Sequence, residues 1–310
     1  MAIVHKLSLG EFLPLVDRLR QGHSGLDQLL DFLQGFQVRI DLPGIDEQDI
    51  DLNFTGNILQ ISRKKSVLEQ DREERIIAVS AKMRLALGIA EKIAATDKSV
   101  LIYGATGTGK DLFARTIHRL SPRRDAPFVW LPGGTLNKEN VEQQLRHTLE
   151  AADTGTLFFD ELEDFEPLVQ QQLLAVLEKP RSFRIISATS ADLSEAVLKQ
   201  EFSGDLAELL RECYIELEEL SRRKEEIAPL VRYHLDRLCR EKGVSPKEPS
   251  PEYQALLEAY SWPGNVRELI NTLEQSLLVA REKKTLFVKD LPAHIRIRTM
   301  QTVAQRKRGV

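Results

Sequence analysis

The chain has 310 residues, of which 42% are hydrophobic and 29% are charged, with a formal net charge of −4. This composition is that of an ordinary globular protein, long enough for two or three packed units without covalent staples. The charge balance offers no general attraction to nucleic acid, and Cys213 and Cys239 lack the spacing of a metal site. The sequence shows neither an N-terminal signal pattern nor a long apolar run, which predicts a cytoplasmic protein without membrane spans.

The first part of the chain, residues 1–70, is predicted to be a small helical and β module that contacts a protein partner. Leucine and phenylalanine recur at helical spacing in residues 7–35, which indicates two short amphipathic helices. Alternating apolar and polar residues then predict strands, with Gly56 and Asn57 as the turn between the last two. These strands are residues 36–42, 50–54 and 58–61. The densely charged run at 63–75 is typical of a solvated linker.

A glycine-rich loop follows the apolar run Val100–Tyr103 and precedes a helical pattern. Glycines let successive backbone N–H groups converge on one anion, and Lys110 supplies a positive charge for the terminal phosphates. The strand, loop and helix occur in the order that a phosphate-binding loop requires, which favours ATP binding over a chance glycine turn. The residues predicted to bind the nucleotide are Gly104, Ala105, Thr106, Gly107, Thr108, Gly109, Lys110, Asp111 and Leu112.

Strand and helix patterns alternate from this loop onward, which predicts an α/β fold with a parallel, doubly wound sheet. The further predicted strands are residues 128–131, 156–159 and 184–187. From about Lys224 to Leu278 the strand patterns stop, and we expect a helical lid. The predicted domains are the N-terminal module at 1–70, the α/β nucleotide-binding domain at 71–223, the lid at 224–288 and a basic tail at 289–310.

Two acidic residues end the second buried strand, in the run Thr156-Leu-Phe-Phe-Asp-Glu161. A phosphate loop needs a metal partner and a group that activates water. Asp160 is predicted to hold Mg²⁺ directly or through water, and Glu161 to orient the attacking water. Asp111 stands where the usual loop places a hydroxyl on the metal, and its carboxylate can reach the same metal shell. The alternative is an acidic strand end without a role.

From about Ile76 to Leu278 the chain resembles the AAA+ ATPase domain of the bacterial enhancer-binding proteins, the activators of sigma-54 RNA polymerase. Four segments carry the resemblance in order: Gly104–Leu112, Gly155–Glu161, Pro180–Leu193 and Trp262-Pro-Gly-Asn-Val-Arg-Glu-Leu269. The resemblance implies a P-loop AAA+ sheet with a helical lid, ATP binding, oligomerisation and a role in transcription regulation. Arg267 matches the lid arginine that senses the nucleotide phosphates, and Asn265 is predicted to cap the helix that carries it. The alternative is a surface arginine near a helix start.

Three departures from the family pattern bear on function. The interval Pro132–Thr154, mostly a polar helix at 138–152, contains no GAFTGA-type loop, so remodelling of sigma-54 itself is not expected. The pair Thr189-Ser190 stands where the family has Thr-Asn. Near Arg222 and Arg223, Ser221 replaces one of the family's arginines.

The segment Phe202–Arg211 aligns with a family segment whose two arginines reach the neighbouring subunit's ATP site. Those positions are Ser203 and Leu209 in this chain. Such arginines contribute about 10³ to 10⁵ in turnover, so we expect weak hydrolysis by the chain alone. Arg211 is a poor substitute for Leu209, because two helical steps rotate a side chain by about 200°.

The two ends of the chain also differ from the family. Residues 289–310 are basic but too short for a helix-turn-helix, so we expect no sequence-specific DNA binding, with non-specific nucleic-acid contact as the alternative. Residues 36–65 resemble the first half of an α-crystallin domain of the small heat-shock proteins. An ordinary hairpin explains that pattern equally well. In either case an open strand edge can pair with a partner strand.

Taken together, the sequence predicts a cytoplasmic AAA+ regulatory protein that binds ATP with Mg²⁺. It is expected to self-associate or to join a mixed ring with an AAA+ homologue, and to act through protein contacts. Two other classes stay open. One is an ATP-dependent remodelling or assembly enzyme for a target other than sigma-54, and the other is a nucleotide-stabilised adaptor without turnover.

Overall fold

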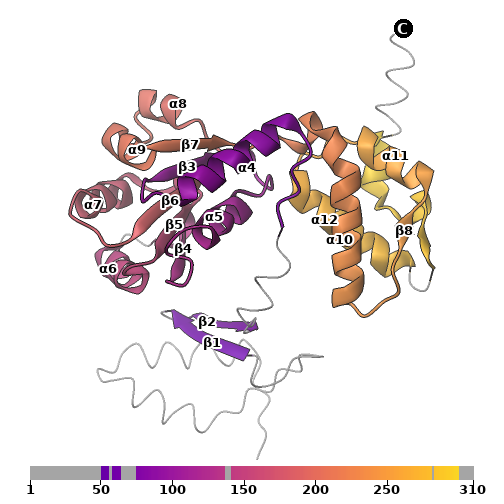
Figure 1. Ribbon diagram of the computed structural model, residues 1–310, viewed down its shortest axis with the longest axis horizontal. Coiled ribbons are helices and arrows are strands. Elements are labelled where there is room, and N and C mark those ends of the chain that lie inside the picture. Colours follow the sequence, from indigo (N-terminus) through magenta and orange to yellow (C-terminus); the bar gives the residue numbers. More distant parts are fainter. Residues whose placement is uncertain (1–49, 56–57, 64–74, 137–140, 281–282, 300–310) are drawn as a thin grey trace, which may run out of the picture. The chain divides into compact units, whose positions relative to one another are not determined.

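The computed structural model describes residues 50–55, 58–63, 75–136, 141–280 and 283–299. The chain divides into two compact units, 1–74 and 75–310, which are described separately (Figure 1). The helices expected within 7–35 and the strand expected at 36–42 lie outside the described residues. Within the described ranges, no helix is long and apolar enough to cross a membrane.

The first unit contains the antiparallel pair β1 (Ile50–Thr55) and β2 (Ile58–Arg63). Ile50 pairs with Arg63 and Thr55 with Ile58. The two residues predicted to be the turn therefore lie between the paired strands in the sequence. The hairpin predicted from alternating side chains is therefore confirmed.

The second unit is built on a parallel sheet with the strand order β4-β5-β6-β3-β7. Its strands are β3 (Val100–Tyr103), β4 (Phe128–Pro132), β5 (Thr156–Asp160), β6 (Arg184–Thr189) and β7 (Cys213–Glu216). The four strands predicted from apolar runs are confirmed. The edge strand β7 was not predicted, because Ile215 is its only buried residue and one buried residue makes no apolar run.

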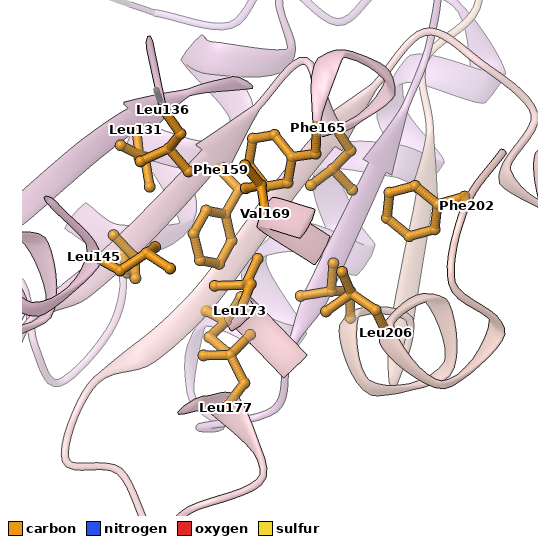
Figure 2. Close-up of a cluster of buried hydrophobic side chains, with 14 of the residues drawn as sticks. Leu131, Leu136, Leu145, Phe159, Phe165, Val169, Leu173, Leu177, Phe202 and Leu206 are labelled. Carbon is orange, nitrogen blue, oxygen red and sulfur yellow. The ribbon is translucent and has the colours of Figure 1, made fainter. Parts of the chain in front are cut away.

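Helices cover both faces of this sheet. They are α4 (Ala81–Ala94), α5 (Lys110–Arg119), α6 (Val141–Ala152), α7 (Pro167–Leu177), α8 (Leu193–Leu198) and α9 (Gly204–Leu210). Successive strand residues point to opposite faces. Leu157 and Phe159 accordingly pack with α6, α7 and α9 (Figure 2), whereas Phe158, between them, packs with α4 and α5. This two-sided burial explains why successive residues of β5, Leu157 to Phe159, are all apolar.

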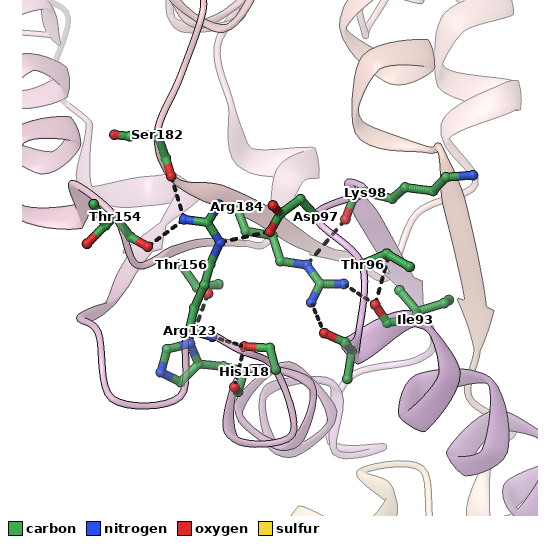
Figure 3. Close-up of polar contacts among 12 residues, drawn as sticks. Ile93, Thr96, Asp97, Lys98, His118, Arg123, Thr154, Thr156, Ser182 and Arg184 are labelled. Carbon is green, nitrogen blue, oxygen red and sulfur yellow. Dashed lines mark hydrogen bonds and ion pairs between the residues drawn. The ribbon is translucent and has the colours of Figure 1, made fainter.

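Two arginines make polar contacts at the end of the sheet where β5 and β6 begin (Figure 3). Arg184 is 1% exposed and donates to the carbonyls of Ile93 and Ala94, so its charge satisfies the carboxyl end of α4. Arg123 donates to Asp97 at 2.8 Å, and this hydrogen bond holds the pKa of the Asp97 carboxyl below its usual value. These contacts lie at the strand ends opposite to the glycine-rich loop.

The lid follows as α10 (Ile227–Glu241), α11 (Pro251–Ala259), α12 (Asn265–Ala280) and a helix at 293–299 around one apolar core (Figure 1). The core includes Leu291 and Ile295, which lie beyond the expected lid boundary at 288. The prediction that strands stop at Lys224 was wrong. Two short strands, β8 (Glu248–Pro249) and β9 (Thr285–Leu286), pair in parallel; each has two residues, too few to produce a periodic pattern.

Short 3₁₀ turns connect several of these elements. They are η2 (Gly133–Thr135), η3 (Leu162–Asp164), η4 (Leu220–Arg222), η5 (Lys224–Glu226) and η6 (Val288–Asp290). Glu163 of η3 and Glu226 of η5 take part in the polar contacts around the glycine-rich loop that are described below.

Candidate nucleotide-binding site

The glycine-rich loop joins the end of β3 to the start of α5. Gly107 and Gly109 have φ values of 79° and 101°, a left-handed conformation that glycine adopts without steric cost. A Cβ added to Gly104 would lie 2.9 Å from the carbonyl oxygen of Leu217, so this position is also restricted to glycine. Gly109 caps α5 without a side-chain hydrogen bond. The first N–H groups of the helix therefore remain available to an anion.

Lys110 lies at the first position of α5, and its ammonium group turns back over the loop. Its Nζ donates to the carbonyl of Gly104 at 2.7 Å and to that of Ala105 at 3.5 Å. Burial lowers the pKa of Lys110, and the negative charges of Glu163 and Asp160 partly oppose this shift. The predicted phosphate-binding lysine therefore lies at the loop, close to acidic side chains.

The predicted acidic pair follows on the end of β5. Burial raises the pKa of Asp160, and the charges of Glu161 and Asp111 raise it further, against the effect of the hydrogen bond from the Glu161 N–H at 3.0 Å. Glu161 itself is exposed and left-handed, with φ 54° and ψ 56°, which costs about 1 to 2 kcal/mol for a residue with a Cβ. The charge of Asp111 thus acts on Asp160, while the shared metal shell of these two residues stays a prediction.

A close contact with η2 accompanies the left-handed turn at Glu161. A Cβ added to Gly133 would lie 2.3 Å from the Glu161 carbonyl oxygen, so the loop after β4 packs directly on the turn after β5. Sequence reasoning did not find this role for Gly133, because the contact joins the ends of two different strands.

The residues present fit a magnesium–nucleotide complex. Among the described residues, no group of three or more His, Cys, Asp or Glu side chains could hold a metal ion alone. Mg²⁺ at a nucleotide site needs only one or two carboxylates, because phosphate oxygens and water complete its shell. Asp160 and Asp111 meet that requirement. When bound, the metal would neutralise charge on the phosphates.

Glu163 connects η3 to the end of β6 through hydrogen bonds. It was not among the predicted site residues. Its carboxylate accepts hydrogen bonds from the hydroxyl groups of Thr189, at 2.7 Å, and Ser190, and from the Ser190 N–H at 3.0 Å. The pair Thr189-Ser190 therefore contacts the acidic turn although it lacks the family's amide. The sequence signal that could have identified Glu163 is its place as the third acidic residue in the run Asp160-Glu161-Leu162-Glu163.

The start of α12 rests on the glycine-rich loop. The backbone N–H groups of Val266 and Arg267 donate to the carbonyl of Gly107 at 2.9 and 3.3 Å. A Cβ added to Gly107 would lie 3.1 Å from the Cβ of Arg267. The exposed Arg267 side chain thus begins directly beside the loop, and its charge helps to lower the pKa of Lys110, after burial as the main cause. The contact of Arg267 with nucleotide phosphates stays a prediction.

Asn265 does not cap α12, so that prediction was wrong. Its side chain is 1% exposed, donates to the carbonyl of Thr106 at 3.0 Å and accepts from the N–H of Leu220 at 2.8 Å. The carboxylate of Glu268 instead accepts from the Gly264 N–H at 2.8 Å. The side chain of Asn265 is engaged by two distant segments, which leaves the capping role to Glu268.

A buried ion pair lies beneath the loop. Arg223 and Glu226 have side chains only 2% and 0% exposed and approach to 2.6 Å, and Arg223 also donates to the Thr108 carbonyl at 3.3 Å. Glu226 in turn accepts from the N–H and hydroxyl groups of Ser80, the residue that caps α4. This ion pair therefore links the loop, η5 and the start of α4.

The segment expected to lack catalytic arginines forms α9 and its caps. Ser203 is the N-cap and accepts from the Leu206 N–H at 3.3 Å, while Leu209 packs against the core beneath the sheet. Arg211 follows the helix and lies over the Tyr214 ring, with 4.8 Å between its Cζ and the ring centroid. The helical conformation assumed for this segment is confirmed.

Comparisons with known proteins agree with this geometry. Residues 77–220 match the sigma-54 interaction domain, and residues 221–308 match the AAA+ ATPase lid domain. The chain is 35% identical over 218 residues to the sigma-54-dependent transcriptional regulator SfnR of Pseudomonas fluorescens, covering 62% of this chain and 59% of that protein. It is 34% identical over 247 residues to the DNA-binding transcriptional regulator NtrC of Escherichia coli, covering 71% and 52%.

Among solved structures, NtrX from Brucella abortus in complex with ADP is similar with a TM-score of 0.68 and 27% identity, covering 77% of this chain and 64% of that chain. The chain spans between half and three fifths of the length of the two regulators named above. The similarity extends from the first helix of the α/β sheet through the last helix of the lid. Residues 77–308 therefore belong to the AAA+ ATPases of the sigma-54 activator type, with the interaction domain and the lid in the family's order.

Proposed function

We propose that this chain is an ATP-binding AAA+ regulatory protein that acts through protein contacts and hydrolyses ATP slowly on its own. One contrast carries the proposal. The segment Gly104–Leu112, here called the nucleotide cradle, retains the residues predicted to bind ATP, whereas Ser203 and Leu209 stand at the two positions where the family has arginines.

The local geometry supports nucleotide binding. The glycine conformations leave the start of α5 open, and Lys110 lies over the loop. In this proposal Lys110 holds the terminal phosphates, Asp160 and Asp111 hold Mg²⁺, and Glu161 orients water. Arg267 reaches the phosphates from the lid. The similarity to NtrX, which has been crystallised with ADP and with ATP, is in keeping with this assignment.

The arrangement of α9 supports slow turnover. Ser203 caps the helix and the half-buried Leu209 packs against the core. Neither side chain carries the positive charge that would neutralise a phosphoryl group in a neighbouring subunit. Such an arginine contributes about 10³ to 10⁵ in turnover. A partner with arginines at the matching positions would supply this function in a mixed ring.

The regulatory role rests on the relatives and on the N-terminal unit. The matched relatives are named as transcriptional regulators. The polar helix α6 occupies the interval where the family carries its sigma-54-binding loop, so we propose contacts with proteins other than sigma-54. Residues 1–70 are the proposed partner-binding module, and sequence-specific DNA binding is not part of the proposal.

The test measures ATP affinity and turnover over a range of protein concentrations. Lys110→Ala should weaken ATP binding by about 100-fold, or about 2.7 kcal/mol, whereas Lys92→Ala, an exposed lysine on α4, should leave it unchanged. Turnover of the unmutated chain should stay slow and rise when an AAA+ homologue with both arginines is added.

Three results would change the proposal. Fast, concentration-dependent turnover without a partner would favour the remodelling enzyme. Tight ATP binding without turnover under any condition would favour the adaptor. Absence of Lys110-dependent ATP binding would overturn the proposal altogether.

A further inference from the structure

Glu163 occupies an unusual place for a carboxylate, at the end of the sheet where the nucleotide cradle begins. It lies in η3 directly after β5, and β5 pairs with β6. Thr189, the last residue of β6, and Ser190, which follows it, supply three hydrogen bonds to its carboxylate. The side chain is thus held in one position although the residue is exposed.

These donors also keep the carboxylate charged. Partial burial alone would raise the pKa of Glu163, but the hydrogen bonds from Ser190 and Thr189 outweigh it and lower the pKa below its usual value. A carboxylate that accepts several hydrogen bonds favours its ionised form. Glu163 therefore carries a fixed negative charge at neutral pH.

A single residue, Thr189, connects the charged carboxylate of Glu163 to the nucleotide cradle. Thr189 pairs with Tyr103 in the sheet, and its carbonyl accepts from the Gly104 N–H at 3.2 Å. The Gly104 carbonyl in turn accepts from Lys110 at 2.7 Å. The negative charges of Glu163, Asp160 and Glu161 all act to raise the pKa of Lys110, against the lowering that burial causes.

The position matters because ATP and ADP differ in charge at this end of the site. The lysine of a phosphate loop reaches the β- and γ-phosphates, so the γ-phosphate of ATP adds negative charge where Glu163, Asp160 and Glu161 already gather. Like charges at short range in a partly buried site repel strongly. Mg²⁺ removes most of this repulsion by neutralising the phosphates.

We infer that Glu163 is a specificity-determining residue that reduces the preference of the cradle for ATP over ADP and makes ATP binding depend on Mg²⁺. The inference rests on the proposed function, because it requires that the loop bind nucleotides. Glu163 does not react with the nucleotide. It acts by its charge, which Thr189 and Ser190 hold in place.

The test compares the dissociation constants of ATP and ADP, measured by calorimetry in EDTA and again with Mg²⁺. Glu163→Gln removes the charge and keeps an oxygen for Ser190, and Glu163→Ala removes both. Asp164→Asn removes an exposed carboxylate from the same turn and is the matched control. Thermal unfolding without nucleotide checks that each variant is folded.

In EDTA, both Glu163 variants should raise the preference for ATP over ADP by about tenfold, or about 1.4 kcal/mol. With Mg²⁺ the gain should shrink, and the control should match the unmutated chain in both conditions. An unchanged ratio, or an equal gain with Asp164→Asn, would overturn the inference while Lys110-dependent binding of both nucleotides persists. If the unmutated chain binds neither nucleotide, the proposed function and this inference fail together.

Discussion

The glycine-rich loop and α9 differ in what their residues do, although both belong to the ATPase machinery expected of the family. Around Gly107, the lid helix α12 donates two backbone hydrogen bonds to the loop, and Asn265 binds the neighbouring carbonyl of Thr106. In α9, Ser203 caps the helix and the half-buried Leu209 packs against the core. The loop retains the residues predicted to bind a nucleotide. The side chains at the two α9 positions instead stabilise the folded chain, as a helix cap and as an apolar contact.

The contrast between the loop and α9 means that nucleotide binding and catalysis in trans depend on different residues of the chain. The cradle is assembled within one chain, because the loop, the acidic turn at Glu161 and the lid all meet in the second unit. Catalytic arginines would act on a neighbouring chain, and their loss leaves the cradle intact. Under the proposed function, such a chain would bind a nucleotide and act through its protein contacts.

The largest expected effect concerns the ion pair beneath the loop. Arg223→Ala should lower the free energy of unfolding by about 3 to 5 kcal/mol, because it leaves the charge of Glu226 buried without its partner. Arg222→Ala, at the exposed neighbouring position, should change it by about 0.5 kcal/mol or less. Urea denaturation of both variants measures the difference. A loss below about 1 kcal/mol for Arg223→Ala would mean that the pair does not hold the loop in place.

A smaller effect is expected at the contact between loop and lid. Gly107→Ala should destabilise the chain by about 2 kcal/mol, because the left-handed φ is strained with a Cβ and that Cβ would lie 2.3 Å from the Gly264 carbonyl oxygen. ATP affinity should fall as well. Gly88→Ala, in open space on α4, should stabilise the chain by about 0.5 to 1 kcal/mol through helix propensity. Equal effects from the two substitutions would contradict the close contact.

The smallest expected effect concerns α9. Ser203→Ala should cost about 1 kcal/mol by removing the helix cap, and Ser203→Asn should retain most of the stability because asparagine caps equally well. Neither substitution should alter ATP affinity, which calorimetry can measure beside thermal unfolding. A loss of ATP affinity in Ser203→Ala would show that α9 contributes to the cradle of its own chain.

Much of the α/β fold could be predicted because burial on both faces makes the central strands rich in apolar residues, such as Leu157-Phe158-Phe159 in β5 and Ile185-Ile186 in β6. The phosphate loop was equally visible, since its glycines and Lys110 are neighbours in the chain. The edge strand β7 could not be predicted, because the alternation of its side chains buries Ile215 alone. The paired strands β8 and β9 are held by partners far apart in the chain, which no local pattern reveals.

The parts of the candidate site that escaped prediction depend on contacts between distant segments. Asn265 looked like a helix cap from its neighbours, but its partners are Thr106 and Leu220. Glu163 is placed by Thr189 and Ser190, which lie on another strand. Local spacing identifies residues of the right chemistry, and only the folded chain decides which of them meet.

The most direct test of the account mixes the unmutated chain with the triple variant Lys110→Ala, Ser203→Arg, Leu209→Arg. The first has a cradle without arginines, and the second has arginines without a working cradle. Thermal unfolding first confirms that the triple variant is folded. We expect ATP turnover of the mixture to exceed the sum of the separate proteins by at least about tenfold, because one arginine finger alone can contribute far more. Turnover of the unmutated chain alone that equals that of the mixture would contradict the account.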